Sequence, residues 1–217
     1  MNQAGDSLRY QVDPQNLRRL NYGNSDYDFR HVLNLNYVWD VPFMSKNRFL
    51  GGWTVSGVLY KRSGEPYSVV NTGIPGKLLG NYSTTAGYVM ADFLGGSTPG
   101  CTVNVACLSA AQFATAATQT DFGNIARNGF RGPGYFDTDL SIKKTFRITE
   151  SGLAFTLGAN AYNVLNHPNF GNPDNSITSN TFGTVQNTVT PASSPYGNFQ
   201  GAAVSGRILQ LELKLKF

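Results

Sequence analysis

The feature that most constrains the fold is a strict alternation of apolar and polar side chains at the end of the chain. After Arg207, the odd positions carry four leucines and end on Phe217, while the even positions carry mostly glutamine, glutamate and lysine. A period of two places the leucines on one face of a β-strand and the polar residues on the other. A last strand of this kind is unusual for a soluble domain.

The same alternation recurs four more times upstream, so the chain is predicted to form five strands. Most of these strands have ten or more residues, whereas a strand in a soluble protein typically has about five or six. The predicted strands lie near residues 28–41, 53–62, 135–146, 153–165 and 203–217.

The connections between these strands alternate in length. Pro42–Gly52 and Arg147–Gly152 are short, whereas 63–134 and 166–202 are long and rich in Gly, Asn, Ser, Thr and Pro. A long unstructured loop argues against a compact soluble domain, but outer-membrane barrels combine short periplasmic turns with long extracellular loops. We therefore predict an all-β fold: an antiparallel transmembrane β-barrel segment in the cell outer membrane. Residues 1–27 are then the end of an outer loop.

Five strands are too few to close a barrel, since bacterial single-chain barrels have at least eight. An open sheet with a lipid-facing surface leaves two strand edges unpaired, which is unfavourable in the bilayer and in water. The first residues are polar and show no secretory signal. We therefore expect an incomplete barrel, formed by the last five strands of a larger protein.

Composition excludes several other classes. Only 14% of the residues are charged, against about 25% in an ordinary soluble domain. The chain contains only three glutamates, which argues against a helical bundle or coiled coil. The net charge is +4, and the Lys and Arg residues are scattered without a stripe, so nucleic acid is not an expected partner. Aromatic residues flank the short turns as an interfacial girdle would: Trp39, Phe43, Phe49, Trp53, Phe146 and Phe155.

The long connection 63–134 contains two further signals. Cys101 and Cys107 are separated by five residues, a spacing that suits a small disulfide-closed loop in an oxidising compartment. A zinc site is the weaker alternative, because it needs four ligands and the two histidines lie far along the chain. Ser109–Ala117 combines helix-forming residues with a Ser N-cap, which predicts a short helix inside the loop.

Four polar residues are candidates for contact with a ligand or the barrel lumen. Asp137 and Asp139 share the polar face of one strand and could bind a cation, although pairing with Lys143 or a neighbouring Arg is the simpler interpretation. Arg127 and Arg131 could contact an anionic ligand or lipopolysaccharide, or anchor the base of the loop through hydrogen bonds.

Three further polar features of the sequence indicate a binding site weakly or not at all. Asn24, Asp26 and Asp28 have the spacing of a calcium loop but lack its later Gly and Glu, so a polar loop entering a strand explains them better. His167 lies in an Asn-His-Pro-Asn turn, where an exposed histidine is expected. The predicted lipid-facing position of Lys144 is close enough to the membrane edge for its ammonium to reach water. No phosphate loop, catalytic triad or acid/base carboxylate pair is present, so neither an enzyme nor a cofactor is expected.

The order of several short motifs resembles the carboxyl-terminal barrel segment of TonB-dependent outer-membrane transporters, in particular the Oar-like group with a carboxypeptidase-regulatory-like domain. The matching stretches are Phe29–Asn34, Gly51–Gly57, Ser63–Tyr67, Gly123–Gly134, Asp139–Lys144, Asn163–Phe170 and Leu213–Phe217. The last stretch, with Leu213, Leu215 and Phe217, resembles the aromatic-ended signal that the barrel assembly machinery binds. The resemblance implies a 22-stranded barrel with an internal plug, driven by the TonB complex; this chain shows five strands, no plug and no TonB box.

The resulting expectation is a transport or receptor protein that takes up an unidentified large or scarce ligand, with outer-membrane lipid and lipopolysaccharide around it. A non-transporting surface or adhesion protein on the same barrel is the main alternative. A secreted carbohydrate-binding β-sandwich is a more distant one.

Overall fold

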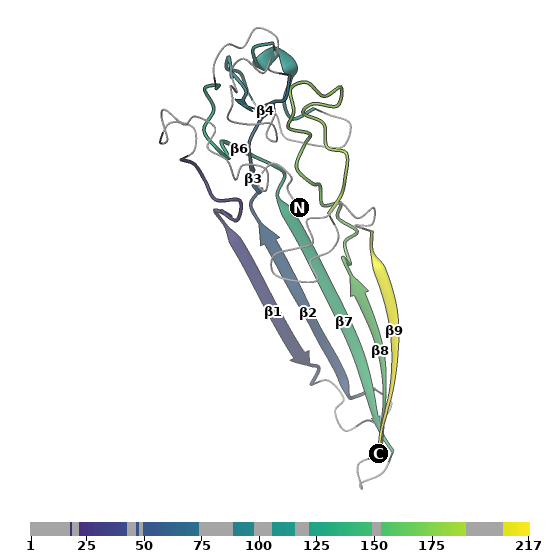
Figure 1. The fold of residues 1–217 in the computed structure, drawn as a ribbon. Coiled ribbons are helices and arrows are strands. Elements are labelled where there is room, and N and C mark those ends of the chain that lie inside the picture. Colours follow the sequence, from purple (N-terminus) through teal and green to yellow (C-terminus); the bar gives the residue numbers. More distant parts are fainter. Residues whose placement is uncertain are drawn as a thin grey trace.

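Five long strands form one antiparallel sheet in the computed structural model, which describes residues 18, 22–42, 47, 50–73, 89–97, 106–115, 122–148, 153–189 and 206–217. The strands are β1 (Val32–Asp40), β2 (Trp53–Arg62), β7 (Tyr135–Arg147), β8 (Ala154–Tyr162) and β9 (Ile208–Lys216). Their order in the sheet is β1-β2-β7-β8-β9, so each strand pairs with the next long strand along the chain. The predicted antiparallel all-β fold is confirmed, and the sheet is open, with β1 and β9 at its edges (Figure 1).

Three of the strands are shorter than predicted. The last begins at Ile208 and not at residue 203, and residues 203–205 lie outside the described residues. The other two are shortened for local reasons. The first begins at Val32 and not at residue 28, because the preceding backbone turns: the Asp28 amide donates to the Ser25 carbonyl. The fourth ends at Tyr162 and not at residue 165, because Asn163 adopts a left-handed conformation with φ of 48°. A left-handed residue cannot continue an extended strand, and asparagine tolerates that conformation better than most residues.

The strand register sorts the sheet into an apolar and a polar face. One row across the five strands is Trp39, Val55, Ile142, Ala159 and Leu211. The neighbouring row, on the opposite face, is Val38, Ser56, Ser141, Asn160 and Gln210. The leucines of β9 therefore continue an apolar surface that spans the whole sheet, including Leu213 and Leu215, which are 68% and 57% exposed. A groove of about 330 Å³ follows the polar face.

The end of the sheet at the short turns is rich in aromatic rings. The Lys144 ammonium lies 5.1 Å from the Trp53 ring centre and 5.0 Å from that of Phe146, and it donates to the Gly51 carbonyl. The side chain thus leaves the apolar face for the turn, as predicted for a lysine at the membrane edge. Phe146 also packs against Phe155, with ring centres 6.0 Å apart. Phe43 and Phe49 lie outside the described residues.

Segments of the two long connections fold together into a cap at the other end of the sheet (Figure 1). Two short ladders organise it: β3 (Pro66–Tyr67) pairs with β6 (Phe130–Arg131), and β4 (Val70–Asn71) pairs with β5 (Val89–Met90). The predicted helix over Ser109–Ala117 is wrong in length and type, because the structure forms only a single 3₁₀ turn, η2 (Ala110–Gln112). Ser109 does cap that turn, and the Gln112 side chain accepts from the Ser109 amide.

The cap has a hydrophobic core of its own. Its buried residues come from both long connections and are Tyr67, Val69, Ala91, Cys107, Leu108, Phe113, Ile125, Phe182 and Val185. Phe113 contacts Phe93 and Phe182, each with ring centres 5.3 Å apart. Because these aromatic and aliphatic groups are withdrawn from water, the cap is stabilised as a packed unit and presents a fixed surface. None of the helices in the described part of the chain is long and apolar enough to cross a membrane.

Candidate ligand-binding site

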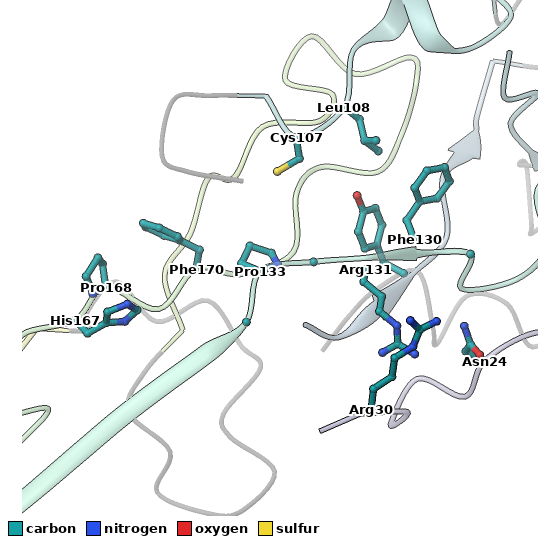
Figure 2. Close-up of a pocket in the computed structure, with 14 residues that line it drawn as sticks. Asn24, Arg30, Cys107, Leu108, Phe130, Arg131, Pro133, His167, Pro168 and Phe170 are labelled. Carbon is teal, nitrogen blue, oxygen red and sulfur yellow. The ribbon is translucent and has the colours of Figure 1, made fainter. Parts of the chain in front are cut away.

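A cavity of about 710 Å³ lies where the cap meets the sheet. One wall is the segment that leads into β7, from Gly129 to Gly134. The opposite walls come from Cys107 and Leu108 of the first long connection and from His167, Pro168 and Phe170 of the second. Figure 2 shows these side chains around the cavity, with Asn24 and Arg30 contributed by the segment before β1. With Tyr67 of β3, five stretches far apart in sequence therefore share one site.

Arg131 is fixed in the wall of the cavity by the segment before β1. Its guanidinium donates to the Asp28 carboxylate, to the Asp28 carbonyl at 2.7 Å and to the Gly64 carbonyl at 3.3 Å. Arg127 forms a similar but longer pair with the Asp26 carboxylate at 3.3 Å. The two candidate arginines thus anchor the loop base, which is one of the two roles that the sequence left open. Asp26 and Asp28, which have the spacing of a calcium loop, serve as their acceptors.

Asn128, between these arginines, joins three segments. It has φ of 54°, a conformation that asparagine accepts more readily than most residues, and it is fully buried. Its side-chain amide donates to the Asn24 carbonyl at 2.8 Å and to Asp26 Oδ1 at 2.6 Å. Its backbone amide donates to Ser68 Oγ at 2.8 Å. A buried polar residue with all these partners fixes the shape of the loop that lines the cavity.

Arg30 and Tyr67 each line the cavity with a polar group that has no partner among the described residues. Arg30 is exposed and forms no hydrogen bond or ion pair there, and Figure 2 shows its guanidinium pointing toward that of Arg131. Tyr67 is 2% exposed and its hydroxyl has no hydrogen-bond partner in the same part of the chain. Burial raises the pKa of Tyr67 above its usual range. The hydroxyl therefore stays protonated and can act as a donor.

Sequence patterns did not single out either residue. Arg30 falls within a predicted strand, and Tyr67 within a motif used only for the family resemblance. Tyr67 reaches the cavity through the pairing of β3 with β6, a contact between residues more than sixty positions apart. No local signal could have found it.

The cavity combines apolar walls with positive charge. Leu108, Phe130, Pro133, Pro168 and Phe170 provide the apolar walls. Arg30, Arg131 and His167 are the basic residues, and none of the described residues that line the cavity is an aspartate or glutamate. The site is therefore suited to a ligand with an apolar body and negative charge.

Asp137 and Asp139 lie on the polar face of β7 and not in this cavity. Asp139 Oδ1 accepts from the Asn163 amide at 3.0 Å, which helps to end β8. The expected pairing with Lys143 is wrong, because Lys143 forms an ion pair with Glu212 of β9 at 2.8 Å. Asp137 is buried, and its Oδ1 has no hydrogen-bond partner among the described residues.

The remaining predicted site residues are a histidine and two cysteines. His167 is exposed, as predicted for a turn, and its ring contacts Phe136 with centres 5.5 Å apart. The described residues contain no group of three or more His, Cys, Asp or Glu side chains that could hold a metal ion. Cys107 is buried in the cap core. Cys101 lies outside the described residues, so the predicted disulfide stays a prediction.

Comparison with known proteins supports the membrane interpretation of the sheet. A family model described as an outer membrane beta barrel domain matches residues 1–210. No curated protein and no solved structure matches the chain.

Proposed function

Because the chain belongs to the outer membrane beta barrel domain family, we propose that it is the carboxyl-terminal part of a TonB-dependent receptor for a large or scarce ligand. Its place is the outer membrane, and its apolar sheet face is the lipid-facing surface of such a barrel. Membership of the family indicates an outer-membrane barrel, and active uptake is what the proposal adds to it.

The observation that carries the proposal is the folded cap with its cavity. A passive pore needs an open lumen, whereas this sheet ends under a packed unit that borders a cavity of about 710 Å³. A site of this size with fixed walls suits capture of a specific ligand before passage. The order of short motifs that resembles the Oar-like transporters supports the same function.

The proposed partners follow from the same orientation. The short turns and Phe217 lie at one end of the sheet and the cap at the other (Figure 1). With the cap outside the cell, Phe217 lies on the periplasmic side, where the barrel assembly machinery would bind β9. The TonB complex would engage a plug contributed by another part of the protein, and lipopolysaccharide would surround the outer rim.

The test is a crosslinking experiment on the protein as its natural host makes it. Formaldehyde crosslinking in living cells is expected to join the protein to TonB, and the adduct should disappear when TonB is deleted. A known TonB-dependent receptor in the same cells serves as the positive control. If that receptor forms the adduct and this protein does not, active uptake is excluded and the alternative of a surface or adhesion protein takes its place.

A further inference from the structure

We propose that the cavity under the cap binds a phosphoryl group, which lies between the guanidinium groups of Arg30 and Arg131. The inference rests on the proposed function only in taking this cavity as the place of ligand capture. It adds the chemistry of the ligand's negatively charged group and the two residues that bind it.

The two guanidinium groups lie apart from the aromatic side of the cavity. Tyr67 and Phe130 are register partners in the β3–β6 ladder, and their rings share the face that packs into the cap core. Arg131 follows Phe130 in β6, so its side chain lies on the other face. Figure 2 shows the guanidinium groups of Arg131 and Arg30 pointing toward one another, and both residues line the cavity. The cavity therefore has a distinct positively charged part.

Arg131 is held in position without a ligand. Its Nη1 donates to the Asp28 carbonyl at 2.7 Å and to the Gly64 carbonyl at 3.3 Å, and its Nη2 donates to the Asp28 carboxylate. Among the described residues Nη2 has no other acceptor, so one of its two hydrogens remains for a ligand oxygen. Because the side chain is already ordered, little conformational entropy is lost when a ligand binds to it.

Arg30 adds a positive charge that no described residue balances. It forms no hydrogen bond or ion pair in that part of the chain, and no described residue that lines the cavity is an aspartate or glutamate. The carboxylate of Asp28 pairs with Arg131 and not with Arg30. Two guanidinium groups that point toward one another repel, and an anion between them replaces this repulsion by attraction to both.

The pairing of two guanidinium groups favours a phosphoryl group over a carboxylate. A carboxylate has two oxygens, and a single guanidinium can bind both of them in a bidentate arrangement. A phosphoryl group has three acceptor oxygens and a charge of about −1.5 to −2 near neutral pH, so it can accept hydrogen bonds from both arginines. The cavity of about 710 Å³ leaves room for the rest of a ligand. Soluble phosphorylated ligands and lipopolysaccharide both carry such a group.

The experiment measures binding of inorganic phosphate to the full protein in dodecyl maltoside by equilibrium dialysis, because this detergent contains no phosphate. Acetate is the matched carboxylate probe. We expect saturable binding of phosphate and at least about tenfold weaker binding of acetate, since acetate carries a single charge and is bound fully by one guanidinium.

Variants of Arg30 assign the binding to this pair, because this exposed side chain has no partner among the described residues. Arg30→Gln is expected to raise the Kd for phosphate by about tenfold or more. Arg30→Lys keeps the charge but loses the planar fork, so its Kd should lie between those of Arg30→Gln and wild type. Arg147→Gln, at the opposite end of the sheet, should leave the Kd unchanged. Heat-modifiable migration on gels checks that each variant is folded.

Limited proteolysis tests the same site without measuring bound phosphate. Arg30 belongs to the segment before β1 and Arg131 to β6, so a phosphate ion between them joins two walls of the cavity and stabilises the closed cap. At a phosphate concentration ten times the wild-type Kd, cleavage within 122–134 should slow by about tenfold in wild type. A tenfold weaker Kd in Arg30→Gln should reduce this protection to about twofold.

Lipid A added to the micelles separates the two sources of the phosphoryl group. Displacement of phosphate by lipid A, but not by dephosphorylated lipid A, assigns the site to lipopolysaccharide. Phosphate binding that lipid A leaves unchanged assigns the site to a soluble ligand. Either result supports a phosphoryl site at Arg30 and Arg131.

Three results would overturn the inference: folded wild-type protein that does not bind phosphate, Arg30→Gln that binds it as tightly as wild type, or acetate that binds as tightly as phosphate. None of them depends on the TonB crosslink. Phosphate binding without a crosslink supports the inference and overturns active uptake, whereas a crosslink without phosphate binding does the reverse.

Discussion

Lys143 and Glu212 form an ion pair that crosses an entire strand, with Lys143 Nζ 2.8 Å from Glu212 Oε2. Lys143 belongs to β7 and Glu212 to β9, and Gly158 of β8 lies between them in the register. The pair can form because glycine leaves no side chain on the polar face at that point. Ser141 and Asn160 extend the same polar network, with Ser141 Oγ donating to Asn160 Oδ1 at 2.6 Å.

A side chain at Gly158 is expected to weaken this link in proportion to its size. A methyl group there would lie 3.3 Å from Lys143 Cγ and 3.4 Å from Glu212 Cβ, so Gly158→Ala needs only a small adjustment. Gly158→Leu must displace the pair. The temperature at which the folded band disappears on semi-native gels should therefore fall clearly for Leu and little for Ala. Equal temperatures for the two variants would show that the ion pair does not depend on the absence of a side chain at Gly158.

The Arg131–Asp28 pair is expected to hold the cap to the segment before β1. Arg131→Gln and Asp28→Asn each remove the charge-assisted bond, which is worth about 1–3 kcal/mol in a partly buried setting. That energy corresponds to roughly a five- to hundredfold larger population of the opened cap. Limited proteolysis of the membrane-embedded protein should show cleavage within 122–134 accelerating by a factor in this range.

The double variant tests whether Arg131 and Asp28 stabilise the cap through their ion pair or independently of each other. If Arg131 and Asp28 act through each other, Arg131→Gln combined with Asp28→Asn should open the cap little more than either change alone. Additive acceleration would mean that the two residues stabilise the cap separately. Arg127→Gln is a useful comparison, since its bond to Asp26 is longer at 3.3 Å, and we expect a smaller effect from it.

The cap is expected to lose stability as the pH rises from about 4.5 to about 7. Burial, together with Asp26, raises the pKa of Glu65 to about 7, and Arg62 opposes this only in part. Below about pH 4.5, its ordinary value, the carboxyl is protonated in both the closed and the opened cap. Between that pH and about 7 only the opened cap ionises, so opening becomes easier, and above about 7 the effect is constant.

Hydrogen–deuterium exchange of cap amides, corrected for the intrinsic effect of pH, measures this loss. For a half-buried group we expect about 1–3 kcal/mol between pH 5 and pH 8. Glu65→Gln should remove most of that dependence and protect the cap at pH 8. A variant that keeps the full pH dependence would assign it to another group.

The alternating strands could be predicted from the sequence because their signal is local and strong. A period of two over nine or more residues determines which side chains share a face, and the register then places Trp39, Val55 and Leu211 in one row. The strand ends were less predictable. Asn163, for example, stops β8 through its left-handed backbone and its hydrogen bonds to His167, and neither is visible as periodicity.

The cavity could not be predicted, because it depends on contacts between distant segments. Asn24 and Asn128 bond each other across 104 positions, and Ser68 bonds Asn128 across 60. The long connections have no periodic pattern, so the sequence indicated their composition but not their packed core. Arg127 and Arg131 were found as candidates, while Arg30 and Tyr67 were missed.

Removal of Phe217 is expected to reduce the amount of assembled barrel more than it reduces the free energy of unfolding of the barrel. Phe217 follows β9 and is 98% exposed in this sheet, so its deletion removes few contacts that stabilise the five strands. Its resemblance to the aromatic end of an assembly signal predicts instead a lower amount of folded protein in the outer membrane, measured by surface labelling and by heat-modifiable migration. Phe217→Tyr keeps an aromatic ring and should restore most of that amount, whereas Leu209→Ala tests whether loss of any apolar β9 residue has the same effect. Surface levels unchanged by the deletion, or lowered equally by Leu209→Ala, would show that the terminal ring is not recognised as a signal.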